Sequence, residues 1–251
     1  MRNYRFTINS EDICESVQIT VNNADLLHQI KNVLRLTPES KEEISFIDGS
    51  GKVFSVSILE IQTKSVIFKV LNTQDSGREL EKQVVFFTPI IKSDAYSLMV
   101  RKLTELGVQE MLPVSFTRSQ KQNIVSLEKD NQRQRLNKII QEATEQCEGA
   151  IPAKLLAIQN LEDAIKGLDK DTLKIFASER MADEDSHQNP KLIQEASEFQ
   201  KLCLLIGPEG GLTDEELEFL LKHGFKPYSL GKRLLKAETA AIALFSSLNL
   251  F

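Results

Sequence analysis

The spacing of apolar residues divides this chain into a β-rich first part and a longer second part in which strands alternate with helices. In residues 1–72, apolar and polar residues alternate from Cys14 to Val21, which predicts a half-buried strand. An amphipathic segment follows at 23–36. Further apolar runs predict strands at 44–47, 53–61 and 65–71. We therefore expect a small β-rich unit at the start of the chain.

The polar stretch Asn72–Lys82 has no periodicity and contains a glycine, so it is the best candidate for a linker. We expect two domains, residues 1–75 and residues 76–251. After the linker, apolar runs predict strands at 84–88, 111–116, 173–177 and 202–206. Helical spacing predicts a helix that Ser93 or Asp94 caps and Gly107 ends, and further helices at 127–147, 161–168, 190–199, 213–223 and from 237 onward. This alternation is typical of an α/β fold with a mainly parallel sheet covered on both sides.

Two strand–glycine–helix loops stand out in the second part. The strand at 202–206 ends in Gly207-Pro208-Glu209-Gly210-Gly211, and Thr213 with Glu216 then forms a capping box that opens a helix. The second loop reads LGKRLLKAETA, residues 230–240. Glycines let the backbone approach a ligand closely, although such turns are often only turns. Because ligands bind at the carboxyl ends of strands in open α/β sheets, two such loops predict one shared crevice.

Composition narrows the class of protein. The net charge is −5, so a uniformly basic nucleic-acid binder is not indicated, although a local basic face is compatible with it. The 3 cysteines and 3 histidines share no ligand spacing, and we expect no metal. No apolar run has the length of a membrane span, and the first residues lack the apolar core of a signal peptide. We expect a soluble, cytoplasmic protein.

The amphipathic segment 23–36 carries His28, Lys31 and Arg35 on its polar face. A solvated helix surface explains these three residues. A phosphate-contacting patch, which Arg2 and Arg5 would extend, explains them as well. The sequence leaves both interpretations open.

Several motifs together resemble one known family. GPEGGLTDEEL and LGKRLLKAETA are similar to the paired signature of the RsmE-type ribosomal-RNA uridine-N3 methyltransferases, members of the SPOUT superfamily. HQIKNVLR, FIDGSG, KLTELGV, PVSFTRS and EATEQC extend the resemblance over nearly the whole chain. It implies a PUA-like β-barrel domain that binds RNA and a SPOUT domain with a deep trefoil knot. It also implies S-adenosylmethionine as cofactor, small-subunit (16S) ribosomal RNA as substrate, and a homodimer.

The resemblance assigns roles to individual residues. Arg233 would lie nearest the target base and would be the catalytic residue. The cofactor-binding residues would be Ala177, Ser178, Glu179, Gly207, Pro208, Glu209, Gly210, Leu230, Gly231, Leu235, Thr239 and Ala240. The RNA-binding residues would be Arg2, Arg5, Lys31, Arg35, Arg118 and Lys236. The chain departs from the family pattern at Glu148-Gly149-Ala150, where an arginine is usual, and at Lys236, where lysine replaces arginine.

These expectations lead to one main hypothesis and two rivals. The main hypothesis is a methyltransferase that uses S-adenosylmethionine and acts on N3 of a uridine, with Arg233 and Lys236 stabilising the deprotonated base. Glu209 or Glu238 could serve as the base, but hydrogen bonding to backbone N–H groups explains them better. One rival is a non-catalytic RNA-binding or ribosome-assembly factor. The other is a different nucleotide-dependent α/β enzyme, which the absence of GxGxxG disfavours.

Overall fold

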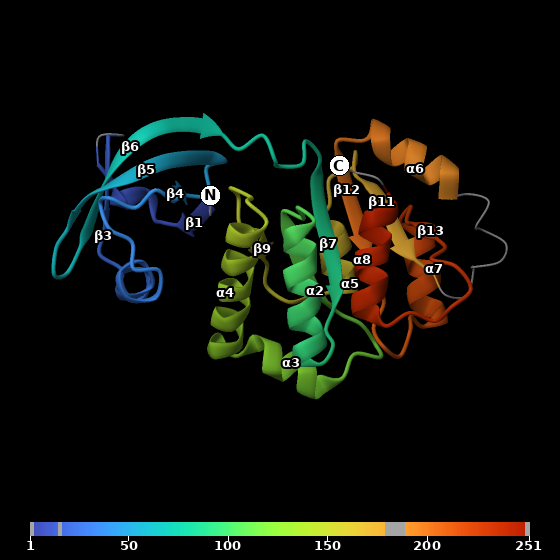
Figure 1. The fold of residues 1–251 in the computed structure, drawn as a ribbon. Helices are drawn as coiled ribbons and strands as arrows, with labels where there is room; N and C mark the ends of the chain where they lie inside the picture. The colour runs from blue at the N-terminus through green and yellow to red at the C-terminus, as the bar shows by residue number, and fades with distance from the viewer. Residues whose placement is uncertain (1–2, 15–16, 179–188, 249–251) are drawn as a thin grey trace. The chain divides into compact units, whose positions relative to one another are not determined.

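The structure, a computed structural model, describes residues 3–14, 17–178 and 189–248. The chain forms two compact units. Figure 1 colours the chain from blue at the N-terminus to red at the C-terminus. The first unit contains residues 1–79 and also residues 144–151. The second contains residues 80–143 and 152–251. The chain therefore leaves the first unit after Glu79 and returns to it once.

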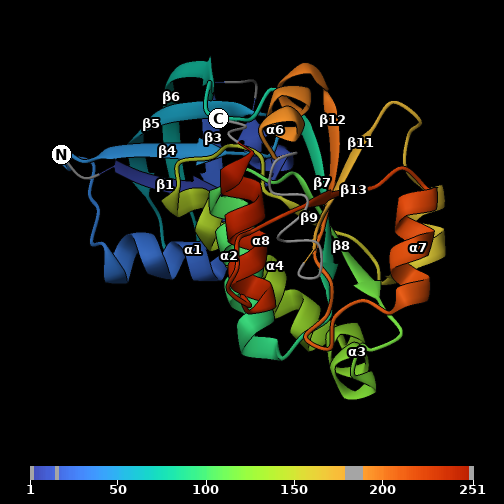
Figure 2. The same ribbon diagram turned by 90° about the vertical axis from the view of Figure 1, so that its right-hand side faces the viewer.

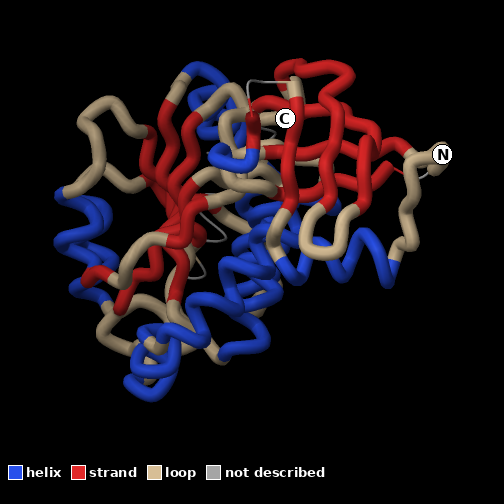
Figure 3. The backbone as a smooth tube through the Cα atoms, turned by 90° about the vertical axis from the view of Figure 1, so that its left-hand side faces the viewer, coloured by secondary structure: helices blue, strands red, loops and turns tan. Residues whose placement is uncertain are grey.

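The first unit is built on a six-stranded sheet in the order β1-β4-β5-β6-β3-β2. Its strands are β1 (Asn3–Thr7), β2 (Ile13–Cys14), β3 (Gln18–Val21), β4 (Glu43–Ile47), β5 (Lys52–Ile61) and β6 (Val66–Asp75). The β1–β4 pair is parallel and the other pairs are antiparallel. Figure 3 shows the sheet curling, and among the described strands its two edges, β1 and β2, are not joined into a closed barrel. β6 extends to Asp75, so part of the expected linker is strand.

An aromatic core fills the curl of this sheet. Phe46 contacts Phe68 edge to face, with ring centroids 4.8 Å apart. The segment expected as one amphipathic helix contains a short helix, α1 (Ala24–His28), followed by a π-helical turn, η2 (Gln29–Val33). Ile30 in that turn is completely buried in the same core. A 3₁₀ turn, η1 (Ser10–Asp12), precedes β2.

Residues 144–151 are held to the first unit by polar contacts. Arg5 donates hydrogen bonds from its guanidinium to the carbonyl oxygens of Glu148 and Gly149. The backbone N–H of Thr7 donates to Glu145 Oε1 at 2.8 Å. The Ala150 N–H donates to a carboxylate oxygen of Glu79 at 2.6 Å. The returning segment is therefore an integral part of the first unit.

The second unit contains a seven-stranded sheet in the order β10-β8-β7-β12-β11-β13, with β9 beside β8. Its strands are β7 (Gln83–Pro89), β8 (Glu110–Ser115), β9 (Lys154–Leu155), β10 (Gln159–Asn160), β11 (Leu173–Ala177), β12 (Lys201–Leu205) and β13 (Lys226–Tyr228). All recorded pairs in this sheet are parallel. The α/β fold with a parallel sheet is confirmed.

Helices cover both faces of this sheet, as Figure 2 shows for α2 and α8 on one side and α7 on the other. The helices are α2 (Ser93–Glu105), α3 (Lys121–Glu128), α4 (Asp130–Gln146), α5 (Leu161–Lys166), α6 (Asn189–Glu198), α7 (Asp214–Lys222) and α8 (Ala237–Ser247). Successive strand residues point to opposite faces: Leu204 packs with the α2 and α8 layer, and Leu205 packs with the α5 and α7 layer.

Two local predictions in this unit are wrong. The single helix expected at 127–147 is divided into α3 and α4, because the backbone is extended at Lys129. Helix α2 is preceded by Lys92 as N-cap residue, without a side-chain cap, and Ser93 and Asp94 already belong to the helix. Within the described residues, no helix is both long enough and apolar enough to cross a membrane.

Candidate functional site

Three neighbouring strands end beside one cavity in the second unit. β12, β11 and β13 are adjacent and parallel, so their carboxyl ends lie at the same edge of the sheet. The cavity measures about 220 Å³. It is lined by Arg118, Phe176, Ala177, Ser178, Ile206, Gly207, Pro208, Glu209, Gly210, Gly211, Leu212, Leu217, Leu230, Gly231, Arg233, Leu235 and Ala240. The two loops that the sequence singled out therefore share one site.

The loop after β12 is a tight glycine turn. The N–H of Gly211 donates to the carbonyl of Pro208 at 2.8 Å, and Gly211 has a φ of +71°, which favours glycine. A Cβ added to Gly207 would lie 3.1 Å from Leu212 Cγ, so that position is also crowded. The backbone itself therefore forms this wall of the cavity.

The capping box expected at the start of the next helix is present. The Thr213 hydroxyl accepts a hydrogen bond from the N–H of Glu216 at 3.1 Å, and Glu216 Oε2 accepts one from the N–H of Thr213 at 2.9 Å. The pKa of Glu215 in the same turn is lowered by a hydrogen bond from its own backbone N–H and by one from Thr213. This helix start favours negative charge.

The loop before α8 forms the opposite wall. Ser229 is buried, and its backbone N–H and carbonyl both bond to the side chain of Asn189. Gly231 has a φ of +93°, and its N–H donates to Ser229 Oγ at 3.3 Å. Leu230 and Leu235 present apolar side chains to the cavity. Asn189 therefore fixes the strand end from which this loop begins.

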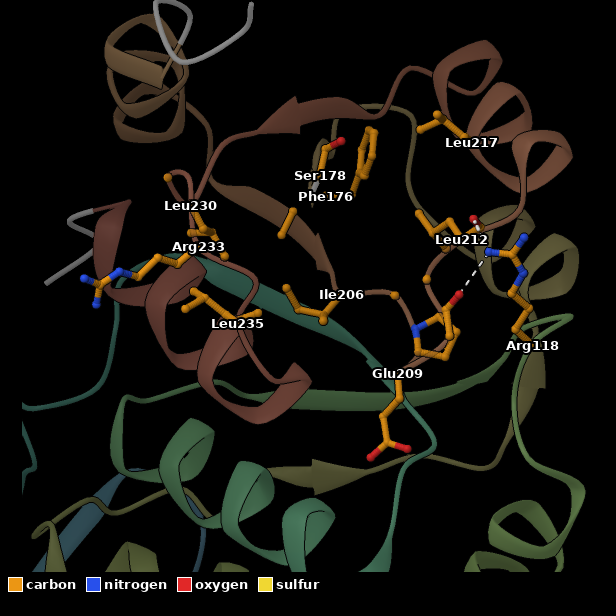
Figure 4. Close-up of a pocket in the computed structure, with 17 residues that line it drawn as sticks. Arg118, Phe176, Ser178, Ile206, Glu209, Leu212, Leu217, Leu230, Arg233 and Leu235 are labelled. Carbon is orange, nitrogen blue, oxygen red and sulfur yellow. Dashed lines mark hydrogen bonds between the residues drawn. The ribbon is translucent and has the colours of Figure 1, made fainter. Parts of the chain in front are cut away.

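Charged side chains lie at the rim of the cavity. Figure 4 shows that the guanidinium of Arg233 and the carboxylate of Glu209 both point away from the apolar centre formed by Ile206, Leu230 and Leu235. Both charged residues are exposed. A ligand in the cavity would thus meet apolar side chains and backbone groups, and a second molecule outside it would meet Arg233.

Arg118, which the sequence predicts as an RNA contact, is exposed at the cavity. Its guanidinium donates to the carbonyl oxygens of Gly210 at 2.9 Å and Leu212 at 3.3 Å (Figure 4). It comes from the loop between β8 and α3, and it forms part of the cavity wall.

Most of the residues expected to bind a cofactor line the cavity. Thr239, exposed in the first turn of α8, is not among the lining residues, and Glu179 lies outside the described residues. Besides Arg118 and Arg233, five lining residues are not expected from the sequence to bind a cofactor: Phe176, Ile206, Gly211, Leu212 and Leu217. Phe176 and Ile206 lie at the ends of apolar runs, and Gly211 and Leu212 continue the glycine loop, which are the signals that could have identified them.

The residues expected to bind RNA differ in their contacts. Arg2 lies outside the described residues, and Arg5 is engaged with Glu148 and Gly149. Lys31 donates to the carbonyls of Gln62 and Thr63 in the β5–β6 turn. Arg35 is exposed with a φ of +54°, and Lys236 is exposed at the N-cap of α8. Arg35 and Lys236 are thus the members of this group whose charges face solvent without a recorded partner among the described residues.

The described residues contain no cluster of three or more His, Cys, Asp or Glu side chains that could hold a metal ion. Cys203, in β12, is completely buried, and burial raises the pKa of its thiol. It therefore behaves as an apolar core residue and not as a nucleophile.

Comparison with known proteins gives consistent matches along the chain. The model of a family described as an RNA methyltransferase domain matches residues 78–249. A "Ribosomal RNA small subunit methyltransferase E" from Rickettsia conorii is 29% identical over 251 residues, covering 100% of this chain and 96% of that protein. A protein of the same name from Synechocystis is 28% identical, covering 98% of this chain and 77% of that protein.

Solved structures show the same fold. A Legionella pneumophila protein, solved in complex with its bound cofactor S-adenosylmethionine, is 26% identical with a TM-score of 0.79, covering 99% of this chain and 98% of that chain. A ribosomal RNA small subunit methyltransferase E from Neisseria gonorrhoeae has a TM-score of 0.81 at 24% identity, covering 99% and 97% of the two chains.

Proposed function

The chain belongs to the family of the RNA methyltransferase domain, and on this premise we propose that it methylates N3 of a uridine in small-subunit (16S) ribosomal RNA, with S-adenosylmethionine as methyl donor. The observation that carries the proposal is the cavity at the ends of β11, β12 and β13, whose walls are the two glycine loops. The names of the relatives support ribosomal RNA as the substrate. The uridine and its N3 atom rest on the resemblance of the loop motifs.

The walls of the cavity fit S-adenosylmethionine. An adenosine has a flat apolar face and polar edges, and Ile206, Leu230 and Leu235 supply apolar contacts. Within the described residues, the N–H groups of Gly207 and Glu209 donate no hydrogen bond, so they are available to polar edges. The lining contains no Lys side chain; of its two arginines, Arg118 is bonded to the Gly210 and Leu212 carbonyls, and Arg233 points away from the apolar centre (Figure 4). This composition favours adenosine recognition over nucleotide phosphate recognition.

When bound, S-adenosylmethionine would supply an electrophilic methyl group. The chain must place N3 of uracil in line with that group and stabilise N3 without its proton, because the protonated nitrogen is a poor nucleophile. Loss of the proton spreads negative charge onto the flanking carbonyl oxygens. The exposed guanidinium of Arg233, assisted by Lys236, would stabilise that charge. Ile206, Leu230 and Leu235 would exclude water from the cofactor side.

Two carboxylates are candidates to accept the proton from N3 of uracil. The Glu209 carboxylate is exposed at the cavity rim, and Glu238 lies half-buried in the first turn of α8. Figure 4 shows the Glu209 carboxylate pointing away from the apolar centre, and Glu238 is not among the residues that line the cavity, so neither is positioned as a base for a ligand inside it. We infer that the electrostatic contribution of Arg233 is larger than that of either carboxylate.

The remaining parts of the proposal concern the fold and assembly. We infer that the first unit is a PUA-like module that contacts RNA, and that the segment leading into α8 closes a trefoil knot. We also infer a homodimer that acts in the cytoplasm. Light scattering of the purified protein tests the dimer, because a monomeric mass at working concentration contradicts it.

Transfer of labelled methyl groups tests the activity. The purified protein is incubated with labelled S-adenosylmethionine and small ribosomal subunits or 16S RNA from cells that lack it. We expect incorporation into one uridine, identified as N3-methyluridine by digestion and mass spectrometry. Folded protein that binds RNA without incorporation, and that shows no calorimetric binding of S-adenosylmethionine, would instead identify a non-catalytic RNA-binding factor.

A further inference from the structure

The glycine loop of the cavity is held from outside by a second loop that carries no expected cofactor residue. This bracing loop, Thr117–Arg118, follows β8, and it meets the loop Gly207–Thr213 that follows β12. The two segments are separated by 92 residues in the sequence at the Arg118–Gly210 contact. Nothing in the local pattern of either segment predicts the contact.

Two side chains make the connection, and each bonds to backbone at two points. Arg118 Nη1 donates to the carbonyl oxygens of Gly210 and Leu212, at 2.9 and 3.3 Å. In the other direction, Glu216 Oε1 accepts from the N–H of Thr117 at 2.7 Å, and Oε2 accepts from the N–H of Thr213 at 2.9 Å. The capping carboxylate of α7 therefore also ties the bracing loop to the start of that helix.

The two loops approach closely enough to crowd a side chain at one position. A Cβ added to Gly210 would lie 3.1 Å from Arg118 Cβ and 3.4 Å from Arg118 Cδ. Arg118 Cβ is fixed to the backbone and cannot move far. A side chain at position 210 would therefore press on Arg118, whether or not a ligand is bound.

We propose that Arg118 and Glu216 are positioning residues that hold the loop Gly207–Thr213 in the shape that binds the cofactor, and that Arg118 does not act primarily as an RNA contact. The reason is the use of the Arg118 donors: they hold the carbonyls of Gly210 and Leu212, in the same loop whose Gly207 and Glu209 N–H groups donate no hydrogen bond among the described residues. Both bonds come from one nitrogen, Nη1, so a lysine would replace them only where its ammonium reaches the same place. The cofactor part of this inference rests on the proposed function.

Four single variants distinguish positioning of the glycine loop from contact with RNA. They are Arg118→Ala, Arg118→Lys, Glu216→Gln and, as a matched control, Lys121→Ala. Lys121 is an exposed cation three positions after Arg118, and it has no recorded partner among the described residues. Loss of a charge-assisted hydrogen bond predicts that Arg118→Ala weakens S-adenosylmethionine binding by about tenfold or more by calorimetry. Arg118→Lys should recover part of that affinity. Lys121→Ala should retain the wild-type value.

Steady-state kinetics separate positioning from chemistry. If the loop is only less well ordered, the KM for S-adenosylmethionine rises in Arg118→Ala and Glu216→Gln, while kcat at saturating cofactor changes much less. The affinity for RNA, measured without cofactor, should be equal in Arg118→Ala and Lys121→Ala. A loss of RNA affinity in Arg118→Ala with unchanged cofactor affinity would overturn the proposal and restore Arg118 as an RNA contact.

Hydrogen exchange gives a readout that does not depend on the cofactor. In the ligand-free protein, amide exchange in residues 207–213 should accelerate by about tenfold in Arg118→Ala and Glu216→Gln, and not in Lys121→Ala. If the wild type binds no S-adenosylmethionine, the proposed function fails while this measurement still decides the bracing. Unchanged exchange in both variants would contradict the bracing itself.

Discussion

The hydroxyl groups of Thr88 and Tyr96 lie 2.9 Å apart in the interior of the second unit, and both side chains are buried. Thr88 is near the end of β7, and Tyr96 is in the first turns of α2. Burial raises the pKa of the Tyr96 hydroxyl far above its usual range, and the hydrogen bond with Thr88 opposes the shift only in part. The folded protein therefore keeps this phenol neutral.

The free energy of unfolding should fall with rising pH above roughly pH 10, where a tyrosine in the unfolded chain ionises. In that range the folded state retains the Tyr96 proton and the unfolded state has lost it, so a higher pH favours unfolding. The slope from this group is at most about 1.4 kcal/mol per pH unit. Urea unfolding of the wild type and of Tyr96→Phe, at pH values below and above 10, measures this slope of the free energy of unfolding against pH. Identical slopes in the two proteins would show that Tyr96 does not contribute.

Arg5 should stabilise the first unit rather than serve only as an RNA contact. Its guanidinium bonds to the carbonyls of Glu148 and Gly149, and half-burial lowers its pKa without removing its charge. We expect Arg5→Ala to lower the free energy of unfolding by about 2 kcal/mol, because two carbonyls lose a charged donor. Lys69→Ala, which removes an exposed cation from β6, should stay within about 0.5 kcal/mol of the wild type. Chemical denaturation compares them, and equal stabilities would favour the RNA role.

Gly210→Ala should reduce the magnitude of the free energy of S-adenosylmethionine binding by more than it lowers the free energy of unfolding. The added Cβ would press on Arg118 Cβ and displace the loop that forms the cavity wall. Gly224→Ala is the matched control, because Gly224 has a φ of +81° with open space around its Cβ position and does not line the cavity. It should cost about 1 kcal/mol of stability and no cofactor affinity. Calorimetry with thermal unfolding separates the two effects. Equal cofactor affinity in both variants would contradict the crowding argument.

Arg233→Ala should lower kcat for RNA methylation by roughly 10²–10³ and leave cofactor affinity nearly unchanged. Cofactor affinity should change little because the Arg233 guanidinium is exposed and points away from the apolar centre of the cavity, on the side where a second molecule would meet it. Arg233→Lys should retain part of the activity, since the charge remains. Single-turnover assays with saturating RNA test this. A large loss of S-adenosylmethionine binding with normal chemistry would place Arg233 on the cofactor and not on the base.

Much of the second unit could be predicted because its signals are local. The strand at Leu173–Ala177 begins and ends where the apolar run does, and the Thr213–Glu216 capping box is formed by residues three positions apart. Parallel strands also made one shared crevice predictable, since their carboxyl ends must meet at one edge. The break between α3 and α4 was not predictable, because Ile124 and Leu127 before it and Leu136 after it all pack on one core and keep an apolar face.

Periodicity and glycine position act within a few residues, so the buried faces and the backbone turns follow from the sequence alone. Which distant groups meet depends on how whole elements pack in three dimensions. Arg5 reaches Glu148 across 143 residues, and Arg118 reaches Gly210 across 92. An arginine that faces solvent, one that contacts RNA and one that bonds to backbone carbonyls have the same local sequence pattern. Their partners depend on the packing of whole elements. For that reason the sequence predicts RNA contact for both arginines, and only the fold shows that both bond to backbone carbonyls.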